Sequence, residues 1–152
     1  MALTQMRPDL PEEFRTVEWI AYASNAFNTM VPFYANVDTT PAYLACTTGE
    51  VSTESFYWVS RMIAAMADAA YGKSIFHVER YEEGVLSATR ALLNAYDEKQ
   101  AQEADPALRA ALRTEANEAI ARELKARAAD TLNKVLFELS CTMKNAFSRS
   151  DA

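Results

Sequence analysis

The fold is decided by residues 105–143, which read DPALRAALRTEANEAIARELKARAADTLNKVLFELSCTM. Asp105 followed by Pro106 is a typical helix start, because aspartate caps free N–H groups and proline is tolerated at the first helical position. No glycine or proline follows Pro106. We therefore predict one helix of roughly forty residues that packs against other long helices. Its apolar face comprises Leu108, Leu112, Ile120, Leu124, Ala128, Leu132, Val135, Leu139 and Met143.

Two shorter helices are predicted upstream of this long one. The first follows the possible cap Ser52-Thr53 and ends before Gly72, which we interpret as its left-handed C-terminal glycine. The second runs from Ser74 to about Asp97, and the polar residues 98–105 form a solvated connection. Apolar residues recur three and four apart in both segments. They are Phe56, Val59, Ile63, Met66 and Ala70, and then Val78, Tyr81, Val85, Ala88, Leu92 and Tyr96.

The first fifty residues favour strands instead. Residues 1–11 are predicted to be irregular, because Pro8 and Pro11 keep their preceding residues out of helical geometry. Residues 16–23 and 29–37 form a hairpin around the turn-forming residues 24–28, with Pro32 at an edge or a bulge. A short extended piece follows at 42–47. A lone hairpin is marginal in water, so its free edges predict association.

Length and charge limit the fold class and the partners. The chain has 152 residues and is 50% hydrophobic, which suits one domain, 1–152, with a hairpin in 1–50 and helices in 51–152. The class is α+β, mainly α. A net charge of −6 without a basic stripe argues against nucleic acid. Neither a membrane span nor a signal peptide is recognisable. Two distant cysteines favour a reducing compartment, so we expect a cytoplasmic protein.

Four ordered stretches carry a family resemblance. The third is the most specific: it contains VST at 51–53, SFYW at 55–58, Arg61, IAA at 63–65 and AD at 67–68. The first stretch combines residues 5–11 and 17–19, and the second combines 31–34, 36–37 and 40–41. The fourth combines residues 143–145 and 147–148. Their order and spacing resemble the C-terminal third of the N-terminal-nucleophile cysteine dipeptidases, the dipeptidase A type of bacteria.

That resemblance implies an αββα hydrolase fold and hydrolysis of dipeptides with broad specificity, without metal or cofactor. In this family a cysteine exposed as a new N-terminus is the nucleophile, and its own α-amino group is the base. Nothing in residues 1–4 resembles that opening region, and Ser60-Arg61 stands where the family usually has Asn-Arg. We therefore predict no catalytic residue here. The chain is expected to be a C-terminal fragment or subunit, inactive without an N-terminal part.

Arg61 is the one substrate-binding candidate. Its guanidinium could hold a substrate carboxylate by a bidentate contact. The alternative is an internal ion pair with Glu54 or Asp68. Nearby aromatic residues could line a pocket or belong to the core; they are Tyr57, Trp58 and Tyr71.

Cys46 and His77 are two further candidates for a functional role. Cys46 precedes two threonines, as the family's nucleophile does, but cleavage before it would leave mostly helices without two facing sheets. We therefore interpret Cys46 as a small residue at a strand end. His77 is the only histidine, which excludes a histidine-built metal site; we expect it on a solvated helix surface. The alternative function is a non-enzymatic helical module, and both functions predict a homo-oligomer.

Overall fold

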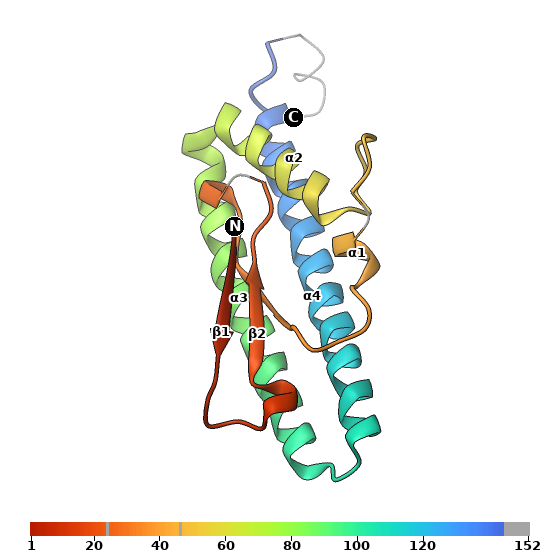
Figure 1. The fold of residues 1–152 in the computed structure, drawn as a ribbon. Coiled ribbons are helices and arrows are strands. Elements are labelled where there is room, and N and C mark those ends of the chain that lie inside the picture. The colour runs from red at the N-terminus through yellow and green to blue at the C-terminus, as the bar shows by residue number, and fades with distance from the viewer. Residues whose placement is uncertain (24, 46, 145–152) are drawn as a thin grey trace.

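A computed structural model describes residues 1–23, 25–45 and 47–144. Within these ranges the chain is mainly helical, with a small antiparallel sheet, so the predicted α+β class is confirmed (Figure 1). Short 3₁₀ turns occur at Glu12–Phe14 and Asn25–Phe27. The strands are β1 (Ala2–Met6), β2 (Thr16–Ile20) and β3 (Val31–Tyr34), and the helices are α1 (Ala42–Ala45), α2 (Phe56–Ala69), α3 (Tyr71–Gln102) and α4 (Pro106–Ser140).

The sheet contains the predicted hairpin and one additional strand. β2 and β3 pair antiparallel, as the sequence predicted, and the structure places Glu18 opposite Phe33. The prediction that residues 1–11 are irregular was wrong, because β1 pairs antiparallel with β2 and completes the order β1-β2-β3. Pro8 and Pro11 follow β1 in the chain, so their restriction on the preceding residue does not reach the strand.

The segment predicted as extended at 42–47 begins as a helix. The N–H groups of Leu44 and Ala45 both donate to the carbonyl oxygen of Pro41, at 2.9 and 3.1 Å. Tyr43 and Leu44 are buried against the neighbouring helices. Pro41 pre-sets helical φ at the start, and alanine and leucine propagate the turn.

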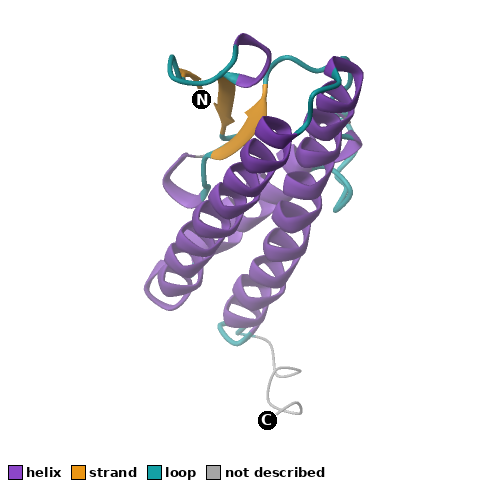
Figure 2. Ribbon diagram, turned by 90° about the horizontal axis from the view of Figure 1, so that it is seen from below, coloured by secondary structure: helices purple, strands orange, loops and turns teal. Residues whose placement is uncertain are grey.

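β3 is the strand that ties the sheet to the helices. It contacts both α3 and α4, and Figure 2 shows it against the helices while β1 lies farther out. At its outer edge the N–H of Tyr34 donates to Asn117 Oδ1 at 2.8 Å, and Asn117 Nδ2 donates to the carbonyl of Tyr34 at 3.0 Å. The side-chain amide of Asn117 therefore takes the place of a neighbouring strand.

The long helix was predicted almost to its ends. α4 has 35 residues, and Asp105 Oδ1 accepts the N–H of Ala107 at 2.9 Å, which confirms Asp105 as the N-cap. The middle of its predicted apolar face is buried. The ends are exposed, with Leu108 at 51% and Met143 at 54% exposure.

Three predicted boundaries of the other helices were wrong. The N-cap of α2 is Ser55, not Ser52-Thr53. Ala70, with φ −131° and ψ 41°, separates α2 from α3, so no left-handed residue is needed and Gly72 lies inside α3. α3 also continues to Gln102. Gln100, placed in a solvated connection by the sequence, is fully buried and accepts a hydrogen bond from Arg113 at 3.4 Å.

The core has two adjoining parts. The larger lies between β3, α2, α3 and α4 and contains Phe56, Ile63, Val85 and Leu124. The smaller lies between β2, β3, the C-terminal half of α3 and the N-terminal half of α4. The buried residues of this smaller part include Phe14, Val17, Trp19, Tyr34, Leu93 and Tyr96.

No helix in the described ranges combines the length and the apolar character that a membrane span requires.

Candidate functional site

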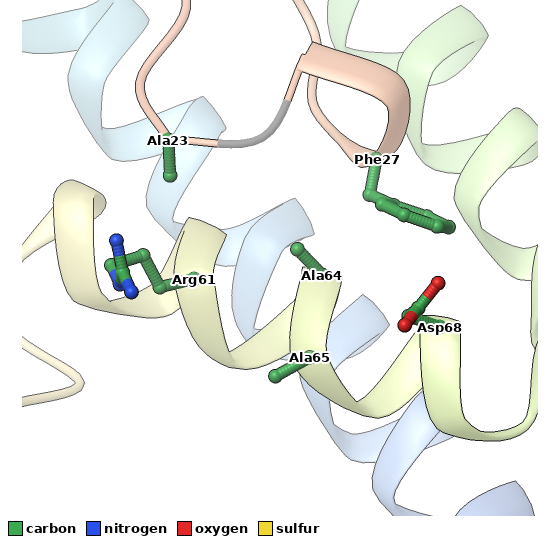
Figure 3. A pocket seen from close by; sticks show the side chains of 6 residues that line it. All are labelled: Ala23, Phe27, Arg61, Ala64, Ala65 and Asp68. Atoms are coloured by element: carbon green, nitrogen blue, oxygen red, sulfur yellow. The ribbon is translucent and has the colours of Figure 1, made fainter.

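A hollow of about 390 Å³ lies between α2 and the segment that joins β2 to β3 (Figure 3). Arg61 and Asp68 stand at its two ends, and the small side chains of Ala64 and Ala65 lie between them on α2. These four residues belong to the stretch whose sequence was most specific. Ala23 and Phe27 complete the lining from the other side.

Among the described residues, Arg61 is held by aromatic side chains and not by an acid. Its Nη1 donates to the hydroxyl oxygen of Tyr57 at 3.3 Å. The guanidinium carbon lies 5.6 Å from the ring centre of Tyr57 and 6.0 Å from that of Trp58, within the range of cation–π attraction. Trp58 is itself anchored, because its indole N–H donates to the carbonyl of Thr48 at 2.9 Å.

The alternative that Arg61 forms an internal ion pair was wrong. Glu54 pairs instead with Lys125, whose Nζ lies 2.5 Å from its carboxylate. Asp68 makes no ion pair or hydrogen bond within the described part of the chain. Arg61 is exposed and therefore retains N–H donors for a ligand.

The hollow carries opposite charges at its ends. Asp68 lies two helical turns beyond Arg61, a rise of about 10 Å along the helix axis. An extended dipeptide spans about 7 Å between its end groups. The guanidinium of Arg61 lies toward Tyr57, on the side away from Asp68 (Figure 3), and would have to turn toward the hollow for one dipeptide to meet both charges. A carboxylate beside Arg61 and an ammonium beside Asp68 would each meet the opposite charge. The small alanines between them leave room for a peptide.

The segment above the hollow is positioned by a buried amide that the sequence analysis missed. Asn28 Nδ2 donates to Ser60 Oγ at 3.1 Å and also to the carbonyl of Tyr22, and both Asn28 and Ser60 are buried. Ala23 has φ 58°, a conformation that costs a non-glycine residue free energy. From the sequence Asn28 was interpreted only as a turn residue, because its bonding partner Ser60 lies 32 residues away.

The three aromatic candidates lie near the hollow, but none of them lines it. Tyr57 and Trp58 meet edge to face, with ring centres 5.3 Å apart and planes at 78°. Tyr71 is 55% exposed and contacts Phe27 edge to face at 6.2 Å. Of the two alternatives, the core is excluded for Tyr71.

The remaining candidates do not join this hollow. His77 is half-buried on α3, not fully solvated as expected, and its Nε2 lies 3.5 Å from Glu138 Oε1. Cys141 is exposed at the end of α4, and Cys46 lies outside the described residues. In the described ranges no three histidine, cysteine, aspartate or glutamate side chains converge as metal ligands would.

The known proteins to which this chain is similar are named as peptidases or dipeptidases. The profile of peptidase family C69 matches residues 1–84. The dipeptidase of Bifidobacterium longum is 37% identical over 99% of this chain, which covers 35% of that protein. The probable dipeptidase A of Streptococcus pyogenes is 37% identical over 99% of the chain, and the probable dipeptidase B of Lactococcus lactis is 28% identical over 98% of it. The chain covers 31% of each of these two proteins. The chain thus spans about a third of the length of these relatives.

Proposed function

Because the chain belongs to peptidase family C69, we propose that it forms the C-terminal part of a dipeptidase and helps to bind the dipeptide. The observation that carries the proposal is the similarity to proteins named dipeptidase along nearly the whole chain. The hollow at Arg61 adds support, because its opposite charges complement the two ends of a dipeptide.

In this proposal the catalytic nucleophile comes from residues beyond these 152. The relatives are about three times as long, which leaves most of each protein to supply it. Cys141 is a poor candidate, since it is exposed at a helix end and no basic side chain contacts its thiol in the described part of the chain. The proposed chemistry follows the resemblance: a cysteine thiolate attacks the carbonyl carbon of the peptide bond. The complete enzyme is proposed to have an αββα fold and to act in the cytoplasm.

The proposed role of Arg61 is to bind the substrate carboxylate. Titration of the purified chain with Ala-Ala, followed by NMR, should give a dissociation constant that rises about tenfold or more in Arg61→Ala, because a hydrogen bond to a charged group contributes roughly 1.5–3 kcal/mol. Arg90→Ala is the matched control, since Arg90 is also exposed and lies over Trp19, away from the hollow.

A second comparison isolates the carboxylate. Ala-Ala amide carries no terminal carboxylate, so it should bind weakly and equally to the wild-type and Arg61→Ala chains. If Arg61→Ala binds Ala-Ala as tightly as the wild type does, the proposed role of Arg61 is wrong.

The non-enzymatic alternative keeps one supporting observation. Leu136 and Phe137, near the end of α4, are 52% and 64% exposed. Exposed apolar side chains of this size often mark association surfaces. Self-association of the chain, including a homo-oligomeric dipeptidase, therefore remains a proposal alongside the catalytic one.

A further inference from the structure

A second hollow, of about 250 Å³, lies where α1 and the start of α2 meet α4 (Figure 1). Three stretches of chain that are far apart in the sequence line it. They contribute Tyr43 from α1, Thr53, Glu54 and Val59 from the start of α2 and the residues before it, and Lys125, Ala129, Leu132 and Asn133 from α4. In the described part of the chain, this hollow at Tyr43 shares no lining residue with the hollow at Arg61.

An ion pair forms part of the lining. Lys125 Nζ lies 2.5 Å from Glu54 Oε2, and the two side chains are 43% and 73% exposed. An exposed pair of this kind contributes little to stability. An ammonium group has three N–H donors and a carboxylate has two acceptor oxygens, so both members of the pair keep bonding capacity for a ligand.

The hydroxyl of Tyr43 has no hydrogen-bond partner among the described residues, although Tyr43 is only 8% exposed. Buried hydroxyl groups are normally bonded, because water no longer solvates them. Burial raises the pKa of this hydroxyl, and the nearby charge of Glu54 raises it further. Lys125 Nζ lies 5.8 Å from the centre of the Tyr43 ring. The hydroxyl is therefore an unused donor near the ion pair.

The rest of the lining is apolar on one side and polar on the other. Val59 is 2% exposed, Leu132 is half-buried, and Ala129 adds only a methyl group. Thr53 and Asn133 are exposed polar residues. An apolar wall beside a few convergent polar groups is typical of small-molecule sites. The hollow thus suits a small molecule that carries both charges and an apolar group.

We propose that the hollow at Tyr43 binds a free α-amino acid with an aliphatic side chain, such as leucine. The carboxylate of the amino acid would accept from Lys125 and from the Tyr43 hydroxyl, and its ammonium would face Glu54. Its side chain would pack on Val59 and Leu132. The inference reaches beyond the proposed function, because this site binds an amino acid that hydrolysis of a dipeptide releases and takes no part in that hydrolysis.

The spacing of charges distinguishes an amino acid from a dipeptide. Standard bond lengths place the ammonium nitrogen of an amino acid about 2.5 Å from its carboxylate carbon. Lys125 and Glu54 are in direct contact, so one amino acid can lie across the pair and meet both charges. The end groups of an extended dipeptide are about 7 Å apart. The small volume also favours a single amino acid, because pockets for larger ligands begin at about 300 Å³.

A purely structural ion pair is the alternative. Such a pair would tie residues 53–54 to α4. It would not require an unbonded buried hydroxyl or an apolar wall beside the charges. The two explanations differ in whether a ligand that carries both charges binds.

Titration of the purified chain with L-leucine, followed by NMR, tests the inference. We expect saturable binding, with shifts of the amide signals of Tyr43, Val59 and Leu132. Leucinamide lacks the carboxylate, and 4-methylpentanoate lacks the ammonium. Each should bind with a dissociation constant about tenfold higher or more, because each loses a hydrogen bond between charged groups.

Two variants and a matched control assign the binding to this hollow. Lys125→Ala should raise the dissociation constant of leucine about tenfold or more, whereas Lys134→Ala should leave it unchanged. Lys134 is also an exposed lysine of α4, paired with Asp130 at 2.6 Å, and does not line the hollow. Tyr43→Phe should raise the dissociation constant about threefold or more. Its melting temperature should not fall, because the replaced hydroxyl bonds to nothing among the described residues.

The inference is wrong if leucine shows no saturable binding up to about 10 mM, or if 4-methylpentanoate binds as tightly as leucine. Equal weakening by Lys125→Ala and Lys134→Ala would also overturn it. Glu54→Gln guards against an effect on folding, since it should weaken the binding of leucine and leave that of 4-methylpentanoate unchanged.

The same samples separate this inference from the proposed function. Arg61→Ala should bind leucine as the wild type does, and loss of leucine binding in that variant would place the amino acid in the other hollow and overturn the inference. Ala-Ala binding that depends on Arg61 would stand in either case.

Discussion

Asn117 shows how one side chain can finish a sheet. Its amide bonds to both main-chain groups of Tyr34 and is only 3% exposed. Asn117→Ala would leave a buried N–H and a buried C=O without partners, at a cost of about 1–3 kcal/mol each. We expect the free energy of unfolding, measured by urea denaturation, to fall by about 2–4 kcal/mol.

Asn133→Ala is the control for that variant. Asn133 lies on the same helix but is exposed, so its replacement should change the free energy of unfolding by less than about 0.5 kcal/mol. If the two variants lose the same stability, the amide of Asn117 does not act as the neighbour of β3.

Tyr81 links stability to alkaline pH. Burial raises the pKa of its hydroxyl above the ordinary 10.0, and the charges of Tyr43 and Glu82 raise it further. The folded chain therefore keeps a proton that the unfolded chain loses near pH 10, so stability is full below that pH and falls above it. Between pH 9 and 11, Tyr81→Phe should lose about 1.4 kcal/mol less than the wild type in urea denaturation.

Tyr34→Phe distinguishes a bonded hydroxyl from an unbonded one. The hydroxyl of Tyr34 donates to Asp97 at 2.8 Å and contacts the carbonyl of Leu93 at 3.1 Å, whereas that of Tyr81 has no partner among the described residues. At pH 7 Tyr34→Phe should lose about 1–2 kcal/mol and Tyr81→Phe almost nothing. The reverse order would contradict these hydrogen bonds.

Among single residues, the sequence identified those whose chemical type by itself suggests a function. Arg61 was singled out because its charge interrupts a mostly apolar helix, and the structure places it beside a hollow. Asn117 and Asn28 could not be found in the same way, since their bonding partners lie 83 and 32 residues distant. Their importance arises only when the chain is folded.

Among the elements, those with a long local pattern were predicted best. α4 shows its apolar repeat over many turns, and the β2–β3 pair shows alternation and turn residues between the strands. β1 was missed because ALTQM is exposed on both faces and therefore has no buried alternation. The αββα fold that the resemblance implied needs elements beyond this sheet and stays a prediction.

Gly72 tests the boundary between α2 and α3. A left-handed C-terminal glycine would resist replacement, but Gly72 lies inside α3, has no positive φ, and an added Cβ would meet no atom within 4 Å. Gly72→Ala should therefore raise the free energy of unfolding by about 0.5–1 kcal/mol, because alanine is the better helix former. A loss of about 1 kcal/mol would support the left-handed glycine instead.

Gly84→Ala provides the comparison within the same helix. Here an added Cβ would lie 2.7 Å from Nη1 of Arg127, so that flexible guanidinium must move aside. The gain in thermal or urea stability should be smaller than at Gly72. An equal gain at both positions would show that Arg127 is not held over Gly84.

Over the whole molecule, the helices and the closed β3 edge form a packed unit, while the β1 edge and the hollow at Arg61 face outward. This arrangement agrees with our proposal that the chain supports and completes a larger dipeptidase. The family could be recognised from the sequence because its motifs are local. The hollow could not, because Ala23 and Phe27 reach it from another element.

The most direct test of this account is a dipeptide hydrolysis assay on the purified 152-residue chain, with its oligomeric state measured on the same sample. The full-length Bifidobacterium longum dipeptidase is the positive control, and Cys46→Ala and Cys141→Ala test the two thiols. We predict no turnover by the chain alone and no change in either variant. Clear turnover that a thiol reagent blocks and one of these replacements abolishes would contradict the account.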